Sequence, residues 1–392
     1  MMKRVKRKET TGINQQPLTT KEDKDENDPF SIIPLDLIVE ILLKVPTKSV
    51  ASLVFVSKQW LSIISGKCFI NQYLARSSPS PRLLFTVFGF YAPVQFLHSC
   101  SQVDPSSDRH RLNINPDKKN HQNAFSPPIR GLICRQMGSR VMIGNPTTGQ
   151  FLTLPRLKTT RRGVLSFFGY DSVNDAYKVL SMTVLQGHQK RESQVVAEDH
   201  QVYTLGGGAQ NKWRIVECKH PHLPPTPSHV TNKGICLNGV LYYYAWIKNE
   251  GSLISFDLIS EEFNVTKLPE DNPCIVNYNG KVAITSWPTA DGEVHLWVLE
   301  DATTQRWSKV SIVVPSWTAL GGKNHSFRFR GTVSTGELIF SQRCPNKAPF
   351  FFISYNLKEH RAQKVVVSEF GGPYDDTEVY FDHVESPMFC QI

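Results

Sequence analysis

The pattern of apolar and polar positions divides the chain into two regions. Between residues 29 and 76, apolar residues recur at steps of three and four, the period of an amphipathic helix. From Arg82 onward, short β-branched and aromatic runs alternate with glycine, proline and asparagine turns, which is typical of antiparallel strands. Ser-Ser-Pro-Ser-Pro at 77–81 predicts a hinge between them. The sequence therefore predicts an α+β multidomain protein, with a helical domain over 29–78 and a mainly antiparallel β domain over 82–392.

The helical region is predicted to form three short helices and one further turn. Its first apolar stripe consists of Leu35, Ile38, Ile41, Leu42 and Val45. Pro34 suits the first helical turn, where its missing N–H has no partner to lose. Pro46 ends this helix, because the residue before a proline is disfavoured in the α conformation. Thr47 or Ser49 is then expected to cap the second helix, and the further turn is expected over 68–76.

This region carries more apolar side chains than its own packing needs. Those predicted to point away from the stripe are Leu35, Leu37, Val39 and Leu43. A unit of fewer than about 50 residues buries little core and gains stability by docking. A second apolar face therefore favours a partner, although periodicity alone leaves a plain pair of core helices as an alternative.

The same residues resemble an F-box. The matching segments are Pro34-Leu35-Asp36-Leu37, Glu40-Ile41, Val45-Pro46, Lys48-Ser49 and Val56-Ser57-Lys58-x-Trp60. The chain departs from the usual plant pattern at two places. Ile33 replaces the leucine that usually precedes the proline, and Ser52 and Val54 stand where the family commonly has basic residues. In that family the F-box docks a Skp-type adaptor, which a cullin scaffold holds in a ubiquitin ligase. The resemblance implies that the adaptor contact is formed or supported by Pro34, Leu35, Ile38, Ile41, Leu42, Val45, Pro46, Ser49, Val56 and Trp60.

The β region contains a repeated unit of strand, turn, strand and a second such hairpin. The residues that precede the last turn of each unit are Asn145, Leu205, Asp257, Asp301 and Asn356, which are 60, 52, 44 and 55 residues apart. Units of four strands at such spacing indicate a β-propeller. A first unit from Arg82 brings the count to about six blades, and 377–390 supplies one more strand to complete the first blade and close the ring. A pair of β-sandwiches is the alternative.

These units also resemble the plant F-box-associated, kelch-like domain over about 127–367. The matching segments are Gly-Leu-Ile-Cys at 131–134, Asn-Pro-Thr-Thr-Gly-Gln at 145–150, Gly-Tyr-Asp at 169–171, Tyr-Lys-Val-Leu at 177–180, Gly-Ile-Cys-Leu-Asn-Gly-Val-Leu-Tyr-Tyr at 234–243 and Ser-Phe-Asp-x-x-Ser-Glu-x-Phe at 255–263. Together the two resemblances imply the substrate-recognition subunit of an SCF-type ubiquitin ligase, in which partner subunits perform the catalysis. The motif residues are turn and packing positions, so they do not locate a target site.

The distribution of charge along the chain bears on nucleic-acid binding and on nuclear import. The net charge is +9 over 392 residues, and residues 1–28 contribute only +1, from seven basic and six acidic side chains. This diffuse distribution argues against a nucleic-acid-binding arm. Residues 1–28 are polar and are expected to be disordered. Within them the basic cluster Lys3–Lys8 is either a nuclear import signal or part of a solvated tail.

Cysteine usage and hydropathy are those expected of a cytoplasmic or nuclear protein. The eight cysteines are widely spaced and form no CxxC pair. Because the N-terminus has no signal-peptide pattern, we expect reduced thiols. No apolar run approaches the 18 residues of a membrane span, so we expect no membrane partner.

The sequence carries none of the motifs that mark an active site or a cofactor or metal site. We therefore predict no catalytic residues, no cofactor and no metal. The chain has no G-x-S-x-G elbow, P-loop, G-x-G-x-x-G or H-E-x-x-H motif. His220 and His222 form a close pair without a cysteine or carboxylate motif beside them, which favours a structural role over zinc. Trp287 and Trp317 lie beside turn-like segments and are weak predictions for contact with a target protein.

Two other functions stay open at this stage. A propeller enzyme or a glycan- or small-ligand-binding module would need carboxylates or arginines converging at one mouth of the ring. An F-box scaffold acting outside a ligase would look the same in sequence.

Overall fold

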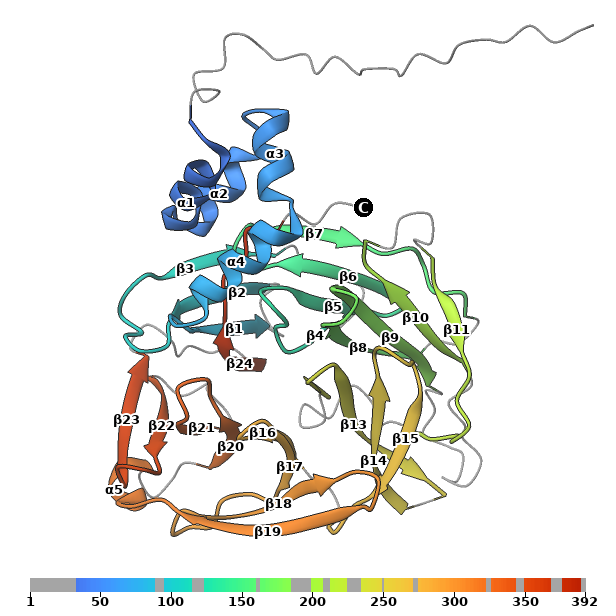
Figure 1. The fold of residues 1–392 in the computed structure, drawn as a ribbon. Helices are drawn as coiled ribbons and strands as arrows, with labels where there is room; N and C mark the ends of the chain where they lie inside the picture. The colour runs from blue at the N-terminus through green and yellow to red at the C-terminus, as the bar shows by residue number, and fades with distance from the viewer. Residues whose placement is uncertain are drawn as a thin grey trace, which may run out of the picture.

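The computed structural model describes residues 33–88, 95–114, 123–159, 163–184, 199–206, 212–223, 234–248, 250–270, 274–321, 326–342, 349–367 and 376–388. The predictions of a disordered tail over 1–28 and of an import signal at Lys3–Lys8 lie outside these residues. Within them, a cluster of helices stands on the edge of a ring of β-sheets (Figure 1).

The helical domain contains four helices rather than three. They are α1 (Leu35–Lys44), α2 (Thr47–Leu53), α3 (Lys58–Ile64) and α4 (Lys67–Ser77). Pro34 and Pro46 occupy the positions just before α1 and α2. The expected side-chain cap of α2 is absent, because Pro46 takes the capping position and makes no side-chain hydrogen bond. The further turn over 68–76 is instead a full helix, α4.

A compact apolar core joins these helices. It consists of Ile38, Leu42, Val50, Val54, Trp60, Ile64, Phe69 and Tyr73. Ile38 and Leu42 are four residues apart and therefore share one face of α1. Ile41 lies at the edge of that face and is 53% exposed, although the periodicity placed it within the stripe. No helix among the described residues is long and apolar enough to cross a membrane.

The β region is a propeller of six four-stranded antiparallel sheets, as predicted. Blade 1 consists of β24 (Asp376–His383), β1 (Arg82–Phe88), β2 (Gln95–Ser101) and β3 (His110–Asn113); blade 2 of β4 (Asn123–Phe125), β5 (Ile133–Met137), β6 (Arg140–Asn145) and β7 (Gln150–Thr153); blade 3 of β8 (Gly163–Asp171), β9 (Ala176–Val184), β10 (His200–Thr204) and β11 (Arg214–Val216). Blade 4 consists of β12 (Ile235–Leu237), β13 (Val240–Ile247), β14 (Glu250–Asp257) and β15 (Phe263–Lys267); blade 5 of β16 (Cys274–Tyr278), β17 (Lys281–Thr285), β18 (Glu293–Asp301) and β19 (Arg306–Val313); blade 6 of β20 (Phe327–Thr332), β21 (Leu338–Gln342), β22 (Phe350–Asn356) and β23 (Arg361–Val367).

The last strand closes the ring. β24 pairs antiparallel with β1, with Val379 opposite Phe85 and Thr377 opposite Val87. The first blade is therefore built from both ends of the β region, and its inner edge is not left open. This arrangement confirms the prediction that the strand within 377–390 completes the first blade.

Each pair of neighbouring blades shares an apolar core. Six such clusters follow one another around the ring. Between blades 6 and 1, Phe350 meets Phe85 edge to face with ring centroids 5.2 Å apart. Between blades 3 and 4, Phe167 stacks on Tyr243 at 4.3 Å. Burial of apolar surface between blades, and not within a single sheet, therefore holds the propeller together.

The repeated turn marker also has a physical basis. In four blades the residue at the end of the third strand accepts a hydrogen bond from the backbone N–H two residues further on. The acceptors are Asn145 (2.9 Å), Asp257 (2.7 Å), Asp301 (2.8 Å) and Asn356 (3.0 Å). Short side chains with an acceptor oxygen stabilise such turns, which explains why asparagine and aspartate recur there.

Candidate functional site

The helical domain is fixed to the ring at one edge. Lys67 Nζ, at the start of α4, lies 3.6 Å from Asp175 Oδ2 in the turn between β8 and β9. Arg130, beside blade 2, donates a 2.5 Å hydrogen bond to Asn71 Oδ1 of α4. Thr47 of α2 donates a 2.8 Å hydrogen bond to Glu385 Oε2, which follows β24. These contacts use polar side chains, and Phe55, which follows α2, also lines a recess opposite Leu112 and Gly149 of the ring.

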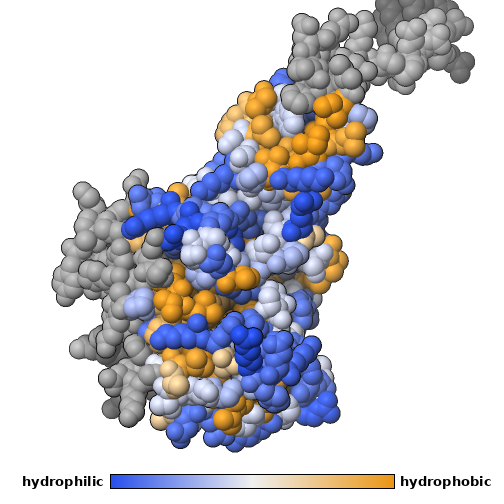
Figure 2. All heavy atoms as spheres, turned by 90° about the vertical axis from the view of Figure 1, so that its left-hand side faces the viewer, coloured by the Kyte–Doolittle hydropathy of each residue, from blue (hydrophilic) through white to orange (hydrophobic). Residues whose placement is uncertain are grey.

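A set of large apolar side chains on the helical domain is exposed. We call Leu35, Leu37, Ile41, Phe55 and Val56 the apolar face; their exposed fractions are 55%, 53%, 53%, 75% and 62%. Leu37 and Ile41 are four residues apart on one side of α1, and Phe55 and Val56 follow α2. Figure 2 shows apolar surface gathered on this domain, beyond the end attached to the ring. Exposed apolar surface concentrated on one small domain is characteristic of an interaction site.

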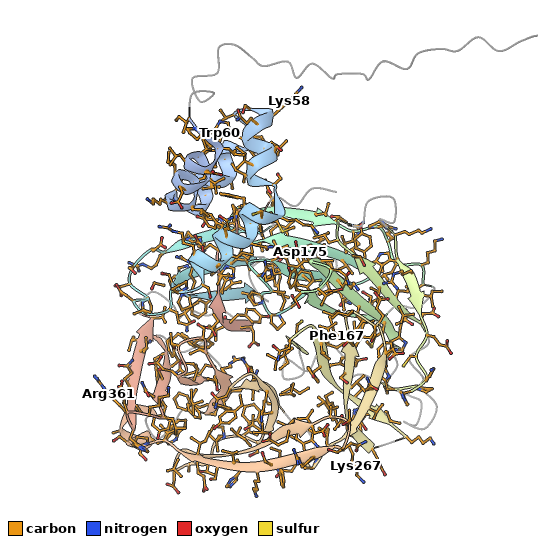
Figure 3. All side chains as sticks on the ribbon, viewed as in Figure 1. Lys58, Trp60, Phe167, Asp175, Lys267 and Arg361 are labelled. Carbon is orange, nitrogen blue, oxygen red and sulfur yellow. The ribbon has the colours of Figure 1, made fainter. Side chains whose placement is uncertain are left out.

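The residues predicted to form or support the adaptor contact fall into two groups. The exposed group consists of Pro34, Leu35, Ile41, Pro46, Ser49 and Val56, while Val45 is half-buried. Ile38, Leu42 and Trp60 are buried in the helical core, and Trp60 lies between the helices in Figure 3. The buried group can therefore only shape and support the surface that the exposed group presents.

Phe55 and Leu37 were missed as site residues. Phe55 is the most exposed member of the apolar face, but it sits in the continuous apolar run Leu53-Val54-Phe55-Val56, where helical period cannot tell an inward from an outward position. Leu37 was expected to point away from the core, and its exposure agrees with that orientation.

The two tryptophans predicted for target contact have different environments. Trp317, at the start of α5 (Trp317–Gly321), is only 8% exposed and packs against Phe327 and Phe340 in the core between blades 5 and 6. Its burial makes it a packing residue, and we correct its assignment as a surface anchor. Trp287 is 40% exposed, and the Arg328 guanidinium lies 5.4 Å from its ring centroid.

A cavity of about 360 Å³ lies among the inner strands β12, β16, β20 and β24. Its lining includes the charged residues Arg328, Arg330, Glu378 and Asp382. Arg330 forms an ion pair with Glu378, and Asp382 Oδ2 accepts a 2.7 Å hydrogen bond from Ser334 N–H. These charges converge as a ligand-binding mouth would require, but Arg330, Glu378 and Asp382 are already engaged in contacts between blades 1 and 6.

Both domains match families of known proteins. A family model described as the F-box domain matches residues 30–72, and one described as the F-box associated beta propeller domain matches residues 82–384. An F-box/kelch-repeat protein of Arabidopsis thaliana is 49% identical over 383 residues, covering 94% of this chain and 96% of the relative. F-box protein DOR of the same plant is 32% identical over 389 residues, covering 92% and 94%.

Among solved structures, the chain is similar to TolB from Acinetobacter baumannii, with a TM-score of 0.45 and 10% identity over 80% of this chain and 70% of that one. The two matching family models and the near full-length relatives agree with the helical domain and the six blades described above. The chain therefore belongs to the plant F-box proteins that carry an F-box associated β-propeller domain.

Proposed function

We propose that this protein is the substrate-recognition subunit of an SCF-type E3 ubiquitin ligase. In this role the F-box domain docks a Skp-type adaptor, through which a cullin scaffold is reached, and the propeller binds a target protein. The chain itself catalyses no reaction. It contributes by holding the target near the catalytic subunits, which raises the effective concentration of the reacting groups.

The observation that carries this proposal is the apolar face. Five large apolar side chains, each more than half exposed, belong to a domain that matches the F-box model. Charged residues lie close to them in the chain, including Asp36 and Glu40 of α1 and Lys58, which begins α3 two residues after Val56. An apolar centre with a polar rim is the usual composition of a protein interface, and the central large side chains supply most of the affinity.

The propeller suits the second role, because a closed ring holds its loops on a rigid frame. Target contact is expected on loops between strands, where sequence can change without loss of the core. Trp287 is our candidate for such a contact, because it is exposed and an aromatic anchor of this kind is often a hot spot.

Adaptor binding by the purified full chain tests the proposal. The binding variant is Leu37→Glu/Ile41→Glu, which places two charges within the apolar face. The matched control is Val313→Glu/Ile259→Glu, which changes two exposed apolar residues of the propeller, 61% and 47% exposed in the wild type. We expect a Skp-type adaptor to co-purify with the wild type and the control, and affinity for the binding variant to fall at least about 30-fold, as for hot-spot residues.

Three results would decide among the functions considered. A folded wild type that retains no adaptor contradicts the proposal and returns attention to the ring cavity. Equal loss in both variants shows that added charge, and not the apolar face, weakens binding. Adaptor binding without ubiquitin transfer to any co-purifying protein in a reconstituted ligase favours the scaffold.

A further inference from the structure

Three potential metal ligands meet at the boundary of blades 3 and 4. They are His200 at the start of β10, and Cys218 and His222 in the connection from β11 to β12. One ligand atom from each lies within 4.8 Å of the other two. His200 and His222 are 3% and 1% exposed, and Cys218 is partly exposed, so the group opens to solvent on the side of the thiol. This cluster is separate from both the apolar face and the ring cavity.

The distances suit a tetrahedral metal ion. Cys218 Sγ lies 3.7 Å from His222 Nδ1. In a zinc site with Zn–S of about 2.3 Å and Zn–N of about 2.1 Å, sulfur and nitrogen ligands are about 3.6 Å apart. The imidazole of His200 has its centroid 5.0 Å from that of His222. The ligand atoms all lie within 4.8 Å of one another, so the widest separation need shorten by only about 1 Å to reach the spacing of ligands around one zinc ion.

The unpaired ring nitrogen of His200 is an independent sign that this group binds a ligand. Its Nε2 is buried and has no hydrogen-bond partner among the described residues. Buried polar nitrogens are nearly always paired, because an unpaired one costs about 1–3 kcal/mol.

The environment of His222 provides the outer partner that metal-binding histidines use. Its Nε2 is 2.7 Å from the hydroxyl of Tyr243, and its Nδ1 is 2.7 Å from the carbonyl oxygen of His220. A metal on Nδ1 would replace the hydrogen bond from Nδ1 to the His220 carbonyl oxygen, and would place the ring proton on Nε2, from which it is donated to the Tyr243 oxygen. Tyr243 is fully buried and stacks on Phe167, so it holds the His222 ring in a fixed orientation.

We propose that His200, Cys218 and His222 form a zinc site that fastens the connection between blades 3 and 4, with a water molecule as the fourth ligand. Zinc fits because two imidazoles and one thiolate are its usual ligands. The Cys218 thiol loses its proton to solvent on binding, while both histidines enter neutral, so one proton is released per ion. From the sequence, His220 was paired with His222 and Cys218, which stands two residues before His220, was passed over. His220 is not one of the three ligands, and His200 comes from a separate strand.

Cobalt titration of the full chain tests the site. The wild type is freed of metal with a chelator, kept under reducing conditions, titrated with Co²⁺ and then with Zn²⁺. We expect one equivalent of Co²⁺ with tetrahedral visible bands and a thiolate-to-cobalt charge-transfer band, all removed by Zn²⁺. Cys218→Ser should lose the charge-transfer band, and Tyr243→Phe should weaken binding about 10–100-fold. The control Cys68→Ser, which changes an exposed cysteine on α4, should behave as the wild type.

The test of the zinc site does not depend on Cys218→Ser alone. If Cys218→Ser fails to fold by circular dichroism, His200→Gln is titrated in its place and should lose the tetrahedral cobalt spectrum. Zn²⁺ should also raise the melting temperature of the wild type but not of Tyr243→Phe at the same concentration. A folded wild type that binds no Co²⁺, or a charge-transfer band that Cys68→Ser abolishes, overturns the proposal.

Discussion

Thr47 and Glu385 are joined by a hydrogen bond of 2.8 Å, although 338 residues separate them in the chain. The same Glu385 carboxylate lies 3.3 Å from Arg82 Nε of β1 and 3.3 Å from His110 Nε2 of β3. One side chain after the last strand therefore holds together α2 and two strands of the first blade. The F-box domain and the closure of the ring share this contact, which makes the position of the helices dependent on a complete first blade.

Removing the Glu385 charge should loosen both the ring closure and the domain junction. Glu385→Gln keeps the shape of the side chain but weakens its contacts with Arg82 and His110. We expect the free energy of unfolding to fall by about 1–3 kcal/mol, the range for hydrogen bonds to charged groups. Denaturant unfolding of the full chain measures the loss, and hydrogen exchange should show faster exchange in α2.

Two further variants locate the effect. Thr47→Val removes the bond from the helical domain to Glu385, together with the 3.0 Å contact between Thr47 Oγ1 and the Tyr73 hydroxyl, and should cost about 1 kcal/mol. Glu359→Gln changes an exposed carboxylate in the turn between β22 and β23 and should leave stability unchanged. If Glu385→Gln is no more harmful than Glu359→Gln, the carboxylate does not join the two domains.

Acid should destabilise the propeller through buried histidines. His383 is 1% exposed, and neither of its ring nitrogens has a hydrogen-bond partner among the described residues. Burial lowers the pKa of His383 to about 3, whereas an unfolded histidine titrates near 6.5. The folded state keeps the ring neutral while the unfolded state binds a proton below pH of about 6.5. Stability is therefore complete above that pH and falls as pH drops from about 6.5 towards 3, by up to about 1.4 kcal/mol per pH unit for each such histidine.

Unfolding curves at pH 7.5 and pH 5 measure this dependence. His383→Gln should reduce the loss between the two pH values, because one buried proton acceptor is removed. His110 and His200, whose pKa values burial lowers to about 4, account for part of the remainder. The same change at the exposed His360 should leave the pH dependence as in the wild type. Equal slopes for His383→Gln and the wild type would show that His383 is not the titrating group.

Replacing Lys178, a buried cation between blades 3 and 4, by a neutral side chain should destabilise the protein. Lys178 Nζ lies 3.2 Å from Asp171 Oδ2 and 3.0 Å from Glu261 Oε1, and Lys178 is only 6% exposed. Burial alone would raise the pKa of Asp171, but hydrogen bonds from Asn174 and Lys178 hold it below its usual value. Lys178→Met leaves a buried carboxylate without its cation and should cost about 3–5 kcal/mol.

The double variant Lys178→Met/Asp171→Asn separates the lost charge from lost packing. It should recover part of the stability at pH 7, because the unpaired buried charge is gone. The loss in Lys178→Met should also shrink near pH 4, where Asp171 without its cation takes up a proton. A loss that neither the second substitution nor acid reduces would assign the role of Lys178 to packing. Lys358→Met, at an exposed position, is the matched control.

The fold could be predicted because its signals are local. Helical period and Pro46 predicted where α1 lies and ends, and turn residues such as Asn145 and Asp257 marked the blades. The sites depend on contacts between distant segments, which periodicity does not record. Glu385 lies in a segment without a repeat, and Phe55 lies in an unbroken apolar run. His200 meets its two partners only because the propeller brings β10 beside the connection that follows β11.

The close approach of two inner strands gives a last prediction, for Gly331 of β20. Gly331 has φ +95°, and a Cβ there would stand 2.2 Å from the carbonyl oxygen of Asn277 in β16. Gly331→Ala combines backbone strain of about 1–2 kcal/mol with overpacking of about 1–3 kcal/mol, so we expect a total loss of about 2–5 kcal/mol. Gly280→Ala is the matched control, because Gly280 has φ +80° but nothing within 4 Å of its added Cβ. The control should lose only the strain, about 1–2 kcal/mol. Denaturant unfolding of both variants measures the difference, and equal losses would mean that β20 can move away from β16 without cost.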